Sequence, residues 1–255
     1  MSAKPQPALI DFQHVTVLRG GRPVLRDLTL HIPLGQHVAI FGPNGSGKST
    51  LIKTITRECY PAARPDTVFR VFGLDAWNVF ELRSILGIVT HDWAGRLDPD
   101  LTGREAVATG RYSSMRLWPD ETIAPELGRR IDRILALLDV RHLADRPISD
   151  MSSGEARRIL IGRALINNPK ALILDEPTNS LDWRTMAEFK AALRRIAARG
   201  KSIIVVTHHP DDLIPEIRRT ILLKDGRLFQ DGPTDRVLTR RHLNALFGMA
   251  APPSR

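Results

Sequence analysis

Cysteine, aromatic residues and long apolar runs are all scarce in this chain. Its 255 residues include one cysteine, Cys59, which excludes an internal disulfide and fits a reducing compartment. No apolar run approaches the ~20 residues that a membrane-spanning helix needs. Residues 1–7 also lack the apolar centre of a signal peptide. We therefore expect a cytoplasmic location, with any role at a membrane exercised through another chain.

Charge is plentiful but not concentrated. Lys and Arg total 37 against 28 Asp and Glu, which gives a formal net charge of +9. The basic residues are spread along the chain, without a long block of like charge and without a basic stripe interleaved with aromatic residues. Solvated helix faces account for most of them, and we expect no nucleic-acid partner.

One glycine-rich stretch carries the strongest functional signal. Residues 42–50 read G-P-N-G-S-G-K-S-T, which matches G-x-x-x-x-G-K-[ST] between an apolar run at 37–41 and a helical pattern. The glycines let backbone N–H groups wrap around phosphate oxygens, and the helix start adds its positive dipole end. Lys48 would reach the β- and γ-phosphates, and the Ser49 hydroxyl would ligate Mg²⁺. The predicted site for a nucleoside triphosphate consists of Gly42, Pro43, Asn44, Gly45, Ser46, Gly47, Lys48, Ser49 and Thr50.

Polar residues also follow three other apolar, strand-like runs. His91, the pair Asp175-Glu176 and His208 each stand at or just beyond the end of such a run. Ligands of open α/β sheets bind at the carboxyl ends of the strands, so we expect these residues at one edge. Asp175 fits the acid that holds Mg²⁺, and Glu176 can polarise an attacking water as a general base. His208 is placed to hydrogen-bond the γ-phosphate, so the group as a whole predicts hydrolysis.

Strand and helix patterns alternate in the order typical of α/β proteins. Short strand-like runs at 9–17 and 24–32 precede the phosphate loop, and continuous apolar runs at 171–174 and 202–206 suit parallel strands covered on both faces. A helical pattern at 183–199 joins the last two, as in a parallel crossover. We predict an α/β fold with a phosphate-loop (RecA-like) parallel sheet core, an N-terminal antiparallel β subdomain and an inserted helical subdomain.

We expect a single domain, residues 1–255, with one insertion. Strand patterns stop near residue 91 and resume after residue 150. We therefore assign residues 91–150 to the helical subdomain and residues 8–90 with 151–249 to the core. Residues 250–255 are expected to be a disordered tail. Other expected elements are helices from the phosphate loop to residue 58 and at 103–112, 129–140 and 235–246, strands at 68–72 and 86–89, a loop at 117–125, and a hairpin at 221–230.

In the order of these segments the chain resembles the ATP-binding-cassette (ABC) ATPases over nearly its whole length. After the phosphate loop come His91, a signature segment at 151–155, the carboxylates at 175–176, residues 180–182 and His208. The signature segment reads M-S-S-G-E, a loose match to the family pattern L-S-G-G-Q. The resemblance to the molybdate-type and photorepair-like branch is the closest within the family.

The resemblance implies an ATP hydrolase that uses Mg²⁺ and works as a homodimer or a pair of related cassettes. Two chains would pair head to tail, each ATP lying between one phosphate loop and the other chain's signature segment. That segment precedes a helix expected at 157–166, whose N-terminus suits an anion. Separate transmembrane permease subunits would hold the protein on the inner face of the membrane. Residues implied in binding across the pair are Ser152, Ser153, Gly154, Glu155 and Asp182.

Three positions depart from the family pattern. Arg19 stands where an aromatic residue often stacks on adenine, and a guanidinium can also stack on a base. His91 stands where a glutamine contacts Mg²⁺, although Mg²⁺ prefers oxygen ligands. Ser153 replaces a glycine, and this would weaken the half-site if the position needs a positive φ. We retain Arg19 as a nucleotide-binding candidate and His91 as a metal-binding candidate.

Three functions remain open from the sequence. The leading hypothesis is the ATP-binding and ATP-hydrolysing subunit of an ABC transporter. The second is a soluble cassette ATPase with a regulatory, nucleic-acid or ribosome-associated role, although the chain has one cassette and no heptad run. The third is a nucleotide sensor with little turnover, suggested by His91 and Ser153.

Overall fold

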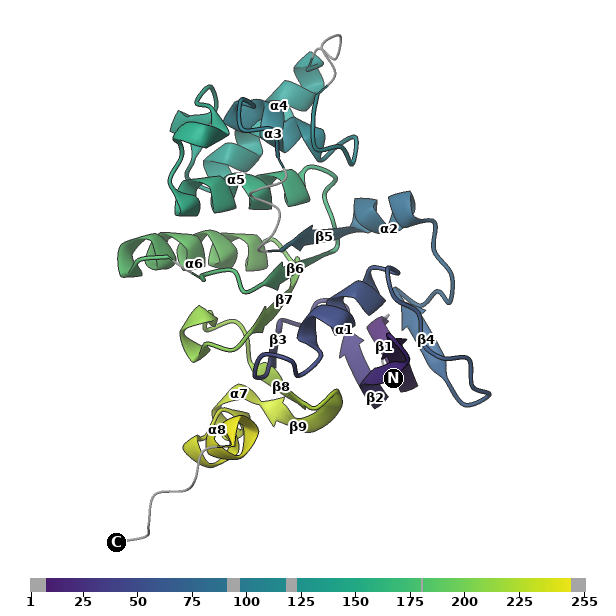
Figure 1. The fold of residues 1–255 in the computed structure, drawn as a ribbon. Helices are drawn as coiled ribbons and strands as arrows, with labels where there is room; N and C mark the ends of the chain where they lie inside the picture. Colours follow the sequence, from purple (N-terminus) through teal and green to yellow (C-terminus); the bar gives the residue numbers. More distant parts are fainter. Residues whose placement is uncertain (1–7, 91–96, 118–122, 180, 249–255) are drawn as a thin grey trace, which may run out of the picture. The chain divides into compact units, whose positions relative to one another are not determined.

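The computed structural model describes residues 8–90, 97–117, 123–179 and 181–248. It divides the chain into two compact units, which are coloured along the sequence in Figure 1. The first unit comprises residues 1–79 and 202–255, and the second comprises residues 80–201. The domain boundaries at residues 91 and 151 stay a prediction.

An antiparallel sheet opens the first unit, as predicted. It has the order β2-β1-β4, formed by β1 (Ala8–Arg19), β2 (Arg22–Pro33) and β4 (Val68–Val71). β1 and β2 extend beyond the predicted runs and turn at Gly20-Gly21, where both φ values are positive, at 55° and 74°. Such a turn matches the twist of a two-residue hairpin.

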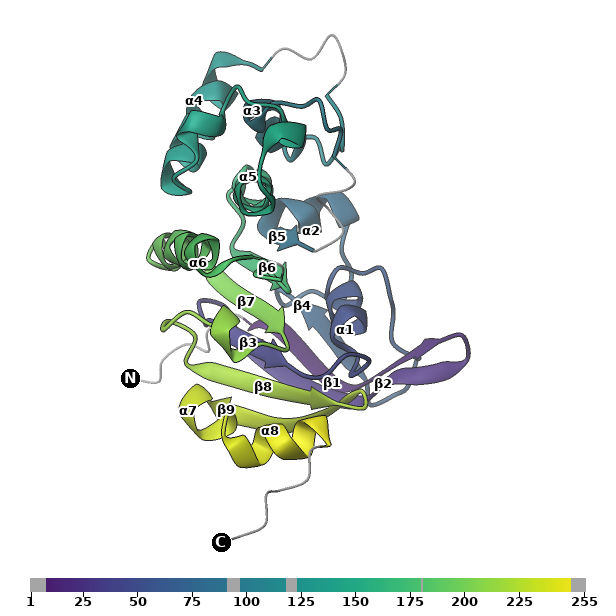
Figure 2. The same cartoon turned by 60° about the vertical axis from the view of Figure 1, so that its left-hand side comes forward.

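A second group of strands in the first unit carries the phosphate loop. β3 (Val38–Phe41) lies between β7 (Ser202–Thr207) and β8 (Arg219–Lys224) and runs parallel to both. β9 (Arg227–Pro233) pairs antiparallel with β8. Figure 2 shows these strands side by side. All four residues of β3 are buried, as expected of a strand in a parallel sheet, whose two faces are both covered by other elements.

The predicted hairpin at the end of this sheet is confirmed. Asp225 and Gly226 form its turn with φ values of 49° and 76°. The Gly226 N–H donates to the Ser46 carbonyl oxygen at 2.9 Å, and the Arg26 N–H donates to the Gly226 carbonyl oxygen at 2.8 Å. Through these two backbone hydrogen bonds, the turn connects the phosphate loop to β2.

The single helix expected at 235–246 is wrong, because two helices occupy this region. They are α7 (Thr234–Val237) and α8 (Arg240–Phe247). The Thr239 side chain accepts a hydrogen bond from the His242 N–H and so starts a new helix, as an N-cap does. Each helix contributes one apolar residue, Val237 or Leu246, to the buried cluster that includes Phe41.

In the second unit, β5 (Leu86–Val89) pairs in parallel with β6 (Ala171–Asp175). α2 (Val79–Ile85) leads directly into β5. α6 (Trp183–Ala197) matches the predicted helix to within two residues, and Gly200 follows it with a φ of 75°. The two strands and the long helix confirm this part of the α/β prediction.

The second unit also contains α3 (Gly103–Thr109), α4 (Pro125–Leu137) and α5 (Ser153–Leu165) (Figure 1). Arg163 of α5 is buried and donates to the Thr109 hydroxyl at 3.0 Å. Burial lowers the pKa of Arg163 to about 10. A buried guanidinium therefore ties α5 to the end of α3.

Several predicted boundaries were wrong for local reasons. Pro125 was assigned to a loop, but it is the first residue of α4, where a proline loses no helical hydrogen bond. α4 ends at Leu137 rather than Val140, before Asp139 with its φ of 58°. α1 (Lys48–Ile55) ends before Arg57, with a φ of 65°, rather than at residue 58.

Some predictions concern residues that lie outside the described ranges: the metal-binding role of His91, most of the loop at 117–125, residue 180 of the segment 180–182, and the tail at 250–255. None of the helices in the described ranges combines the length and apolarity that crossing a bilayer requires.

Candidate active site

The phosphate loop of the first unit has the backbone that its sequence predicts. It leaves β3 at Phe41, and Gly45 and Gly47 adopt φ values of 81° and 105°. A side chain at Gly47 would be strained at this φ and would lie 3.0 Å from Leu25 and 3.3 Å from the Val24 carbonyl oxygen. The loop therefore turns tightly against β2, and only glycine fits there.

The helix after the loop begins without a side-chain cap. Gly47 occupies the N-cap position of α1, where it offers no side-chain oxygen, and the first turn contains no acidic residue. The first-turn N–H groups of a helix have no intrahelical partner, and the dipole favours negative charge beside them. This end of α1 fits a phosphate group.

Lys48 lies back over the loop that precedes it. Its side chain is buried, and Nζ donates to the Gly42 carbonyl oxygen at 2.7 Å and to the Pro43 carbonyl oxygen at 3.1 Å. The Ser46 hydroxyl is buried and lacks a hydrogen-bond partner among the described residues, whereas Ser49 is exposed. A cation, an orphaned hydroxyl and uncapped N–H groups thus gather in one short segment.

The parallel pairing of β3 with β7 places His208 beside the phosphate loop. Phe41 lies opposite Thr207, and the Gly42 N–H donates to the Thr207 carbonyl oxygen at 3.3 Å. The half-buried His208 comes next, with its ring 3.8 Å from that of His209. The Thr207 hydroxyl donates to the buried Asp212 carboxylate, which fixes the start of this loop.

Asp175 and Glu176 lie together at the carboxyl end of β6 in the second unit. Leu174 pairs with Val89, so the predicted adjacency of the β5 and β6 ends is confirmed. Both carboxylate residues are half-buried. Glu176 has a φ of 47°, a left-handed backbone that costs a residue other than glycine about 1–2 kcal/mol. Other contacts must therefore hold this turn.

Arg157 supplies such contacts, and no sequence pattern predicted them. This residue of α5 donates from one nitrogen, Nη1, to the carbonyl oxygens of Glu176 (3.2 Å), Pro177 (2.6 Å) and Asn179 (3.3 Å). Hydrogen bonds from a charged donor are stronger than neutral ones. Nothing in the sequence distinguished Arg157 from the other paired arginines, because its partners are backbone groups more than 15 residues away.

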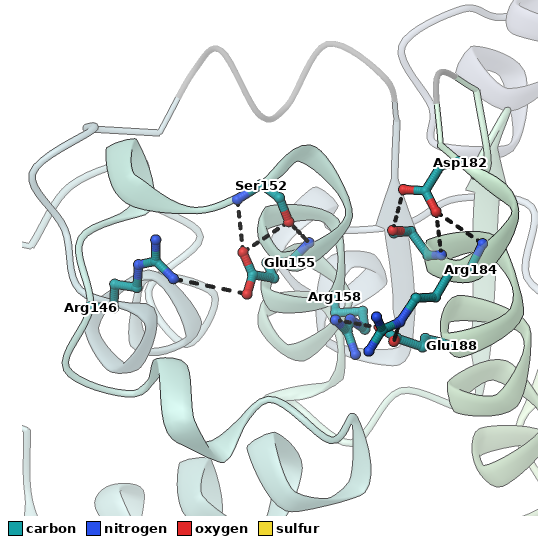
Figure 3. Close-up of polar contacts among 8 residues, drawn as sticks. Arg146, Ser152, Glu155, Arg158, Asp182, Arg184 and Glu188 are labelled. Carbon is teal, nitrogen blue, oxygen red and sulfur yellow. Dashed lines mark hydrogen bonds and ion pairs between the residues drawn. The ribbon is translucent and has the colours of Figure 1, made fainter.

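The signature segment forms the first turn of α5. The helix begins at Ser153 rather than residue 157, with Ser152 as its N-cap (Figure 3). The Ser152 hydroxyl accepts from the Glu155 N–H at 3.3 Å, while Glu155 Oε2 accepts from the Ser152 N–H and hydroxyl, each at 2.8 Å. This reciprocal capping box lowers the pKa of Glu155, chiefly through the backbone hydrogen bond from Ser152.

Ser153 does not need a positive φ. It is the first helical residue of α5 and is not among the residues with left-handed backbone. Because serine adopts helical angles without strain, the concern that it distorts this segment does not apply. Ser152 and Ser153 are both exposed at the start of the helix.

Asp182 caps the neighbouring helix, α6. One of its oxygens accepts from the N–H groups of Arg184 (2.9 Å) and Thr185 (3.0 Å), and the other accepts from the Thr185 hydroxyl at 2.6 Å (Figure 3). The hydrogen bond from the Thr185 side chain is the main cause that lowers the pKa of Asp182. The carboxylate is therefore engaged in starting α6.

Helices α5 and α6 touch at these two starts. A Cβ atom on Gly154 would overlap the Thr185 Cγ2 methyl group, so only glycine allows the approach. Arg158 of α5 and Glu188 of α6 form an ion pair at 3.1 Å (Figure 3). The signature segment and Asp182 thus belong to one packed group.

Arg19 lies at the exposed end of the β1–β2 hairpin, opposite Arg22. Two residues earlier, Val17 pairs with Leu25, the residue that lies against Gly47. The structure therefore places Arg19 on the strand pair that supports the phosphate loop.

These observations define a class of protein. A phosphate loop between a buried parallel strand and a helix, together with a carboxylate pair that ends another parallel strand, is the architecture of phosphate-loop nucleotide hydrolases.

Comparisons with known proteins agree. The ABC transporter family matches residues 25–179. The Nod factor export ATP-binding protein I of Rhizobium johnstonii is 34% identical over 232 residues, which cover 91% of this chain and 71% of that protein. The solved structure of cbiO1 from Clostridium perfringens, described as part of the ABC transporter complex cbiONQ, has a TM-score of 0.78, 27% identity and 97% coverage of both chains. A dimeric bacterial ABC transporter cassette has a TM-score of 0.71 and 27% identity, over 88% of this chain and 98% of that one.

The chain therefore belongs to the ABC transporter family. It is a nucleotide-binding ATP hydrolase of the type that serves as the ATPase subunit of transporters. The predicted resemblance and fold class are confirmed.

The contact between Gly154 and Thr185 predicts a rescue. Gly154→Ala forces a methyl group against the Thr185 methyl, and overpacking of this kind costs about 1–3 kcal/mol of unfolding free energy. Thr185→Ser removes that methyl but keeps the hydroxyl that donates to Asp182, so the double variant recovers most of the loss. Urea unfolding of the two single variants and the double variant measures this. Equal losses in Gly154→Ala with and without Thr185→Ser contradict the packing account.

The hydrogen bonds of Arg157 predict a loss of turnover. Without them the left-handed turn at Glu176 relaxes, so we expect Arg157→Ala to lower kcat for ATP hydrolysis at least about tenfold, equivalent to about 1.4 kcal/mol. The KM for ATP should stay within about twofold, since these hydrogen bonds hold the backbone of the loop at Glu176. Arg157→Lys should recover part of the rate. Arg184→Ala, which removes a largely exposed arginine, is the control, and an equal loss of kcat there rejects a positioning role.

Proposed function

We propose that the phosphate loop, Asp175, Glu176 and His208 form the site of ATP hydrolysis. The observation that carries this proposal is the uncapped, glycine-started helix α1, with Lys48 folded over the loop before it. In this proposal, Lys48 exchanges its carbonyl partners for β- and γ-phosphate oxygens. The N–H groups of residues 45–50 surround the same oxygens.

Mg²⁺ would be held by oxygen ligands. The exposed Ser49 hydroxyl and the Asp175 carboxylate have the donor chemistry that Mg²⁺ prefers, so we propose both as its ligands. When bound, the ion neutralises charge on the β- and γ-phosphates. His91 offers a nitrogen ligand instead, which suits Mg²⁺ less well than oxygen does.

Glu176 is the proposed general base. A carboxylate in hydrogen-bond reach of a water can accept its proton as the water attacks the γ-phosphorus. His208 donates a hydrogen bond to a γ-phosphate oxygen and so helps to position that group. Arg19, at the exposed hairpin end, stacks its guanidinium on the base.

We further propose that two chains pair head to tail. Ser152, Ser153, Gly154 and Glu155 of each chain would then present serine hydroxyl and backbone N–H groups to the γ-phosphate of the ATP held by the other chain. The exposed serines at the start of α5 support this, as does the similarity to a dimeric cassette. Asp182 would line the shared interface from the start of α6.

Transport through separate membrane subunits is the proposed outcome. The relatives include a protein named for export and a structure described as part of a transporter complex. We propose that the segment beginning at residue 91 and the helices up to residue 150 contact such a permease at the cytoplasmic face of the membrane.

Glu176→Gln tests the hydrolytic site and the dimer together. Removing the base stops hydrolysis but leaves ATP binding, so the variant should elute as a dimer in MgATP and as a monomer without nucleotide. Wild type should turn ATP over and not accumulate the dimer. Glu81→Gln, an exposed residue of α2, is the control. Equal and negligible rates in wild type and Glu176→Gln would instead favour a nucleotide sensor.

Purification from membranes tests the transport role. The tagged full-length chain, recovered from detergent-solubilised membranes of its own host, should bring a polytopic membrane protein in stoichiometric amount. ATP hydrolysis by the complex should exceed that of the isolated chain. Recovery of the chain only from the cytosol, with activity that responds to nucleic acid, would contradict transport and favour the soluble role.

A further inference from the structure

A pocket in the second unit carries four cationic side chains. It has a volume of about 350 Å³ and is lined by residues of α4, α5 and α6 and of the segments that follow α5 and α6. Its cations are Arg130 and Arg133 of α4, Arg199 just beyond α6, and Lys201. None of the described residues that line it is acidic. The pocket is therefore large enough for a small ligand, and all of its charged lining residues are positive.

Nearby groups neutralise little of the positive charge on these four side chains. Lys201 Nζ donates to the side-chain oxygen of Asn168 at 2.5 Å, which is a neutral partner. Within the described ranges, no carboxylate lies at ion-pair distance from any of the four. Burial, and then repulsion from Arg130, lowers the pKa of Lys201. Burial also lowers the pKa of Arg130, followed by repulsion from Arg111 and Arg133, with an opposite but smaller effect of Glu126.

Helix dipoles explain only part of this charge. α4, α5 and α6 end at Leu137, Leu165 and Ala197, and each carboxyl end carries about half a negative charge, which basic residues commonly balance. Three such ends together carry roughly one and a half negative charges, which is less than the four positive charges of the cations. Counting Glu126 as well still leaves an excess of more than one positive charge. The excess is what a bound anion would neutralise.

The pocket is separate from the carboxylates of the active site. Asn168 precedes the amino end of β6, whereas Asp175 ends that strand. The strand rises about 3.3 Å per residue, so its two ends lie roughly 13 Å apart. An anion in the pocket would therefore be a second ligand, distinct from the nucleotide phosphates near Asp175.

We propose that this pocket binds an organic phosphate, that is, a phosphate group carried on an apolar body. The four cations match the charge of about −1.5 to −2 that a phosphate monoester carries at neutral pH. The remaining wall consists of Asn168 and four aliphatic side chains, and the aliphatic part suits an apolar carrier rather than a free inorganic ion. Two sources share this chemistry, a soluble phosphorylated metabolite and the headgroup of an anionic phospholipid.

Calorimetric titration with 1-naphthyl phosphate tests the proposal. The full chain is used with its nucleotide site filled by a non-hydrolysable ATP analogue, so that the phosphate loop does not compete for the probe. We expect saturable binding that Arg133→Gln/Arg199→Gln weakens at least about tenfold, because two charged donors are lost. Both residues are exposed, so the variant should fold and hydrolyse ATP normally. 1-Naphthol, which lacks the phosphate, should not bind.

Arg129→Gln/Arg241→Gln is the matched control. It removes two exposed arginines outside the pocket and changes net charge equally. Flotation with phosphatidylcholine vesicles, with and without phosphatidic acid, distinguishes the two sources. Lipid-dependent flotation that is lost only in Arg133→Gln/Arg199→Gln assigns the pocket to a headgroup, and titration alone assigns it to a soluble phosphate. Absence of binding in both experiments, or equal binding by both double variants, overturns the proposal.

Discussion

The burial of β3 between two parallel strands is the constraint on which the first unit depends. Because β7 and β8 pair with it on both sides, β3 has no freedom to shift, and the phosphate loop leaves it at a fixed point. The same pairing sets Thr207 beside Gly42, and His208 follows from that register. In the turn between β8 and β9, the Gly226 N–H donates a hydrogen bond to the Ser46 carbonyl oxygen of the phosphate loop. A four-residue strand thus determines where the chemically active groups of this unit lie.

In the second unit, the positions of the candidate site residues are fixed by hydrogen bonds to helix starts and to loop carbonyl groups. Ser152 and Asp182 each cap a helix, and Gly154 lets the two helices meet at their capped ends. Arg157 extends the group to the left-handed turn at Glu176. The signature segment, the catalytic candidate and the start of α6 are therefore mechanically connected through α5. A displacement of α5 would therefore displace all three of these segments.

The sequence predicted what depends on local pattern. The phosphate loop, the buried strands and the long helix α6 have short-range signals in glycine spacing, apolar runs and period, and the structure confirms them. Boundaries failed where one residue outweighed the periodicity, as Pro125 and Thr239 did. Arg157 could not be predicted, because its partners are carbonyl groups that only the folded chain brings near. The charge of the pocket near Lys201 was equally hidden, since its members are dispersed from residue 130 to residue 201.

The hydrogen bonds of Lys48 to its own loop have a consequence for nucleotide exchange. The ammonium group is buried and donates to two carbonyl oxygens of the loop, so in the proposed site an arriving phosphate would replace these partners. The affinity for nucleotide is then a difference between two good sets of hydrogen bonds and is smaller than either. In the proposed site, the hydrogen bonds of Lys48 to its own loop would therefore weaken the retention of nucleotide.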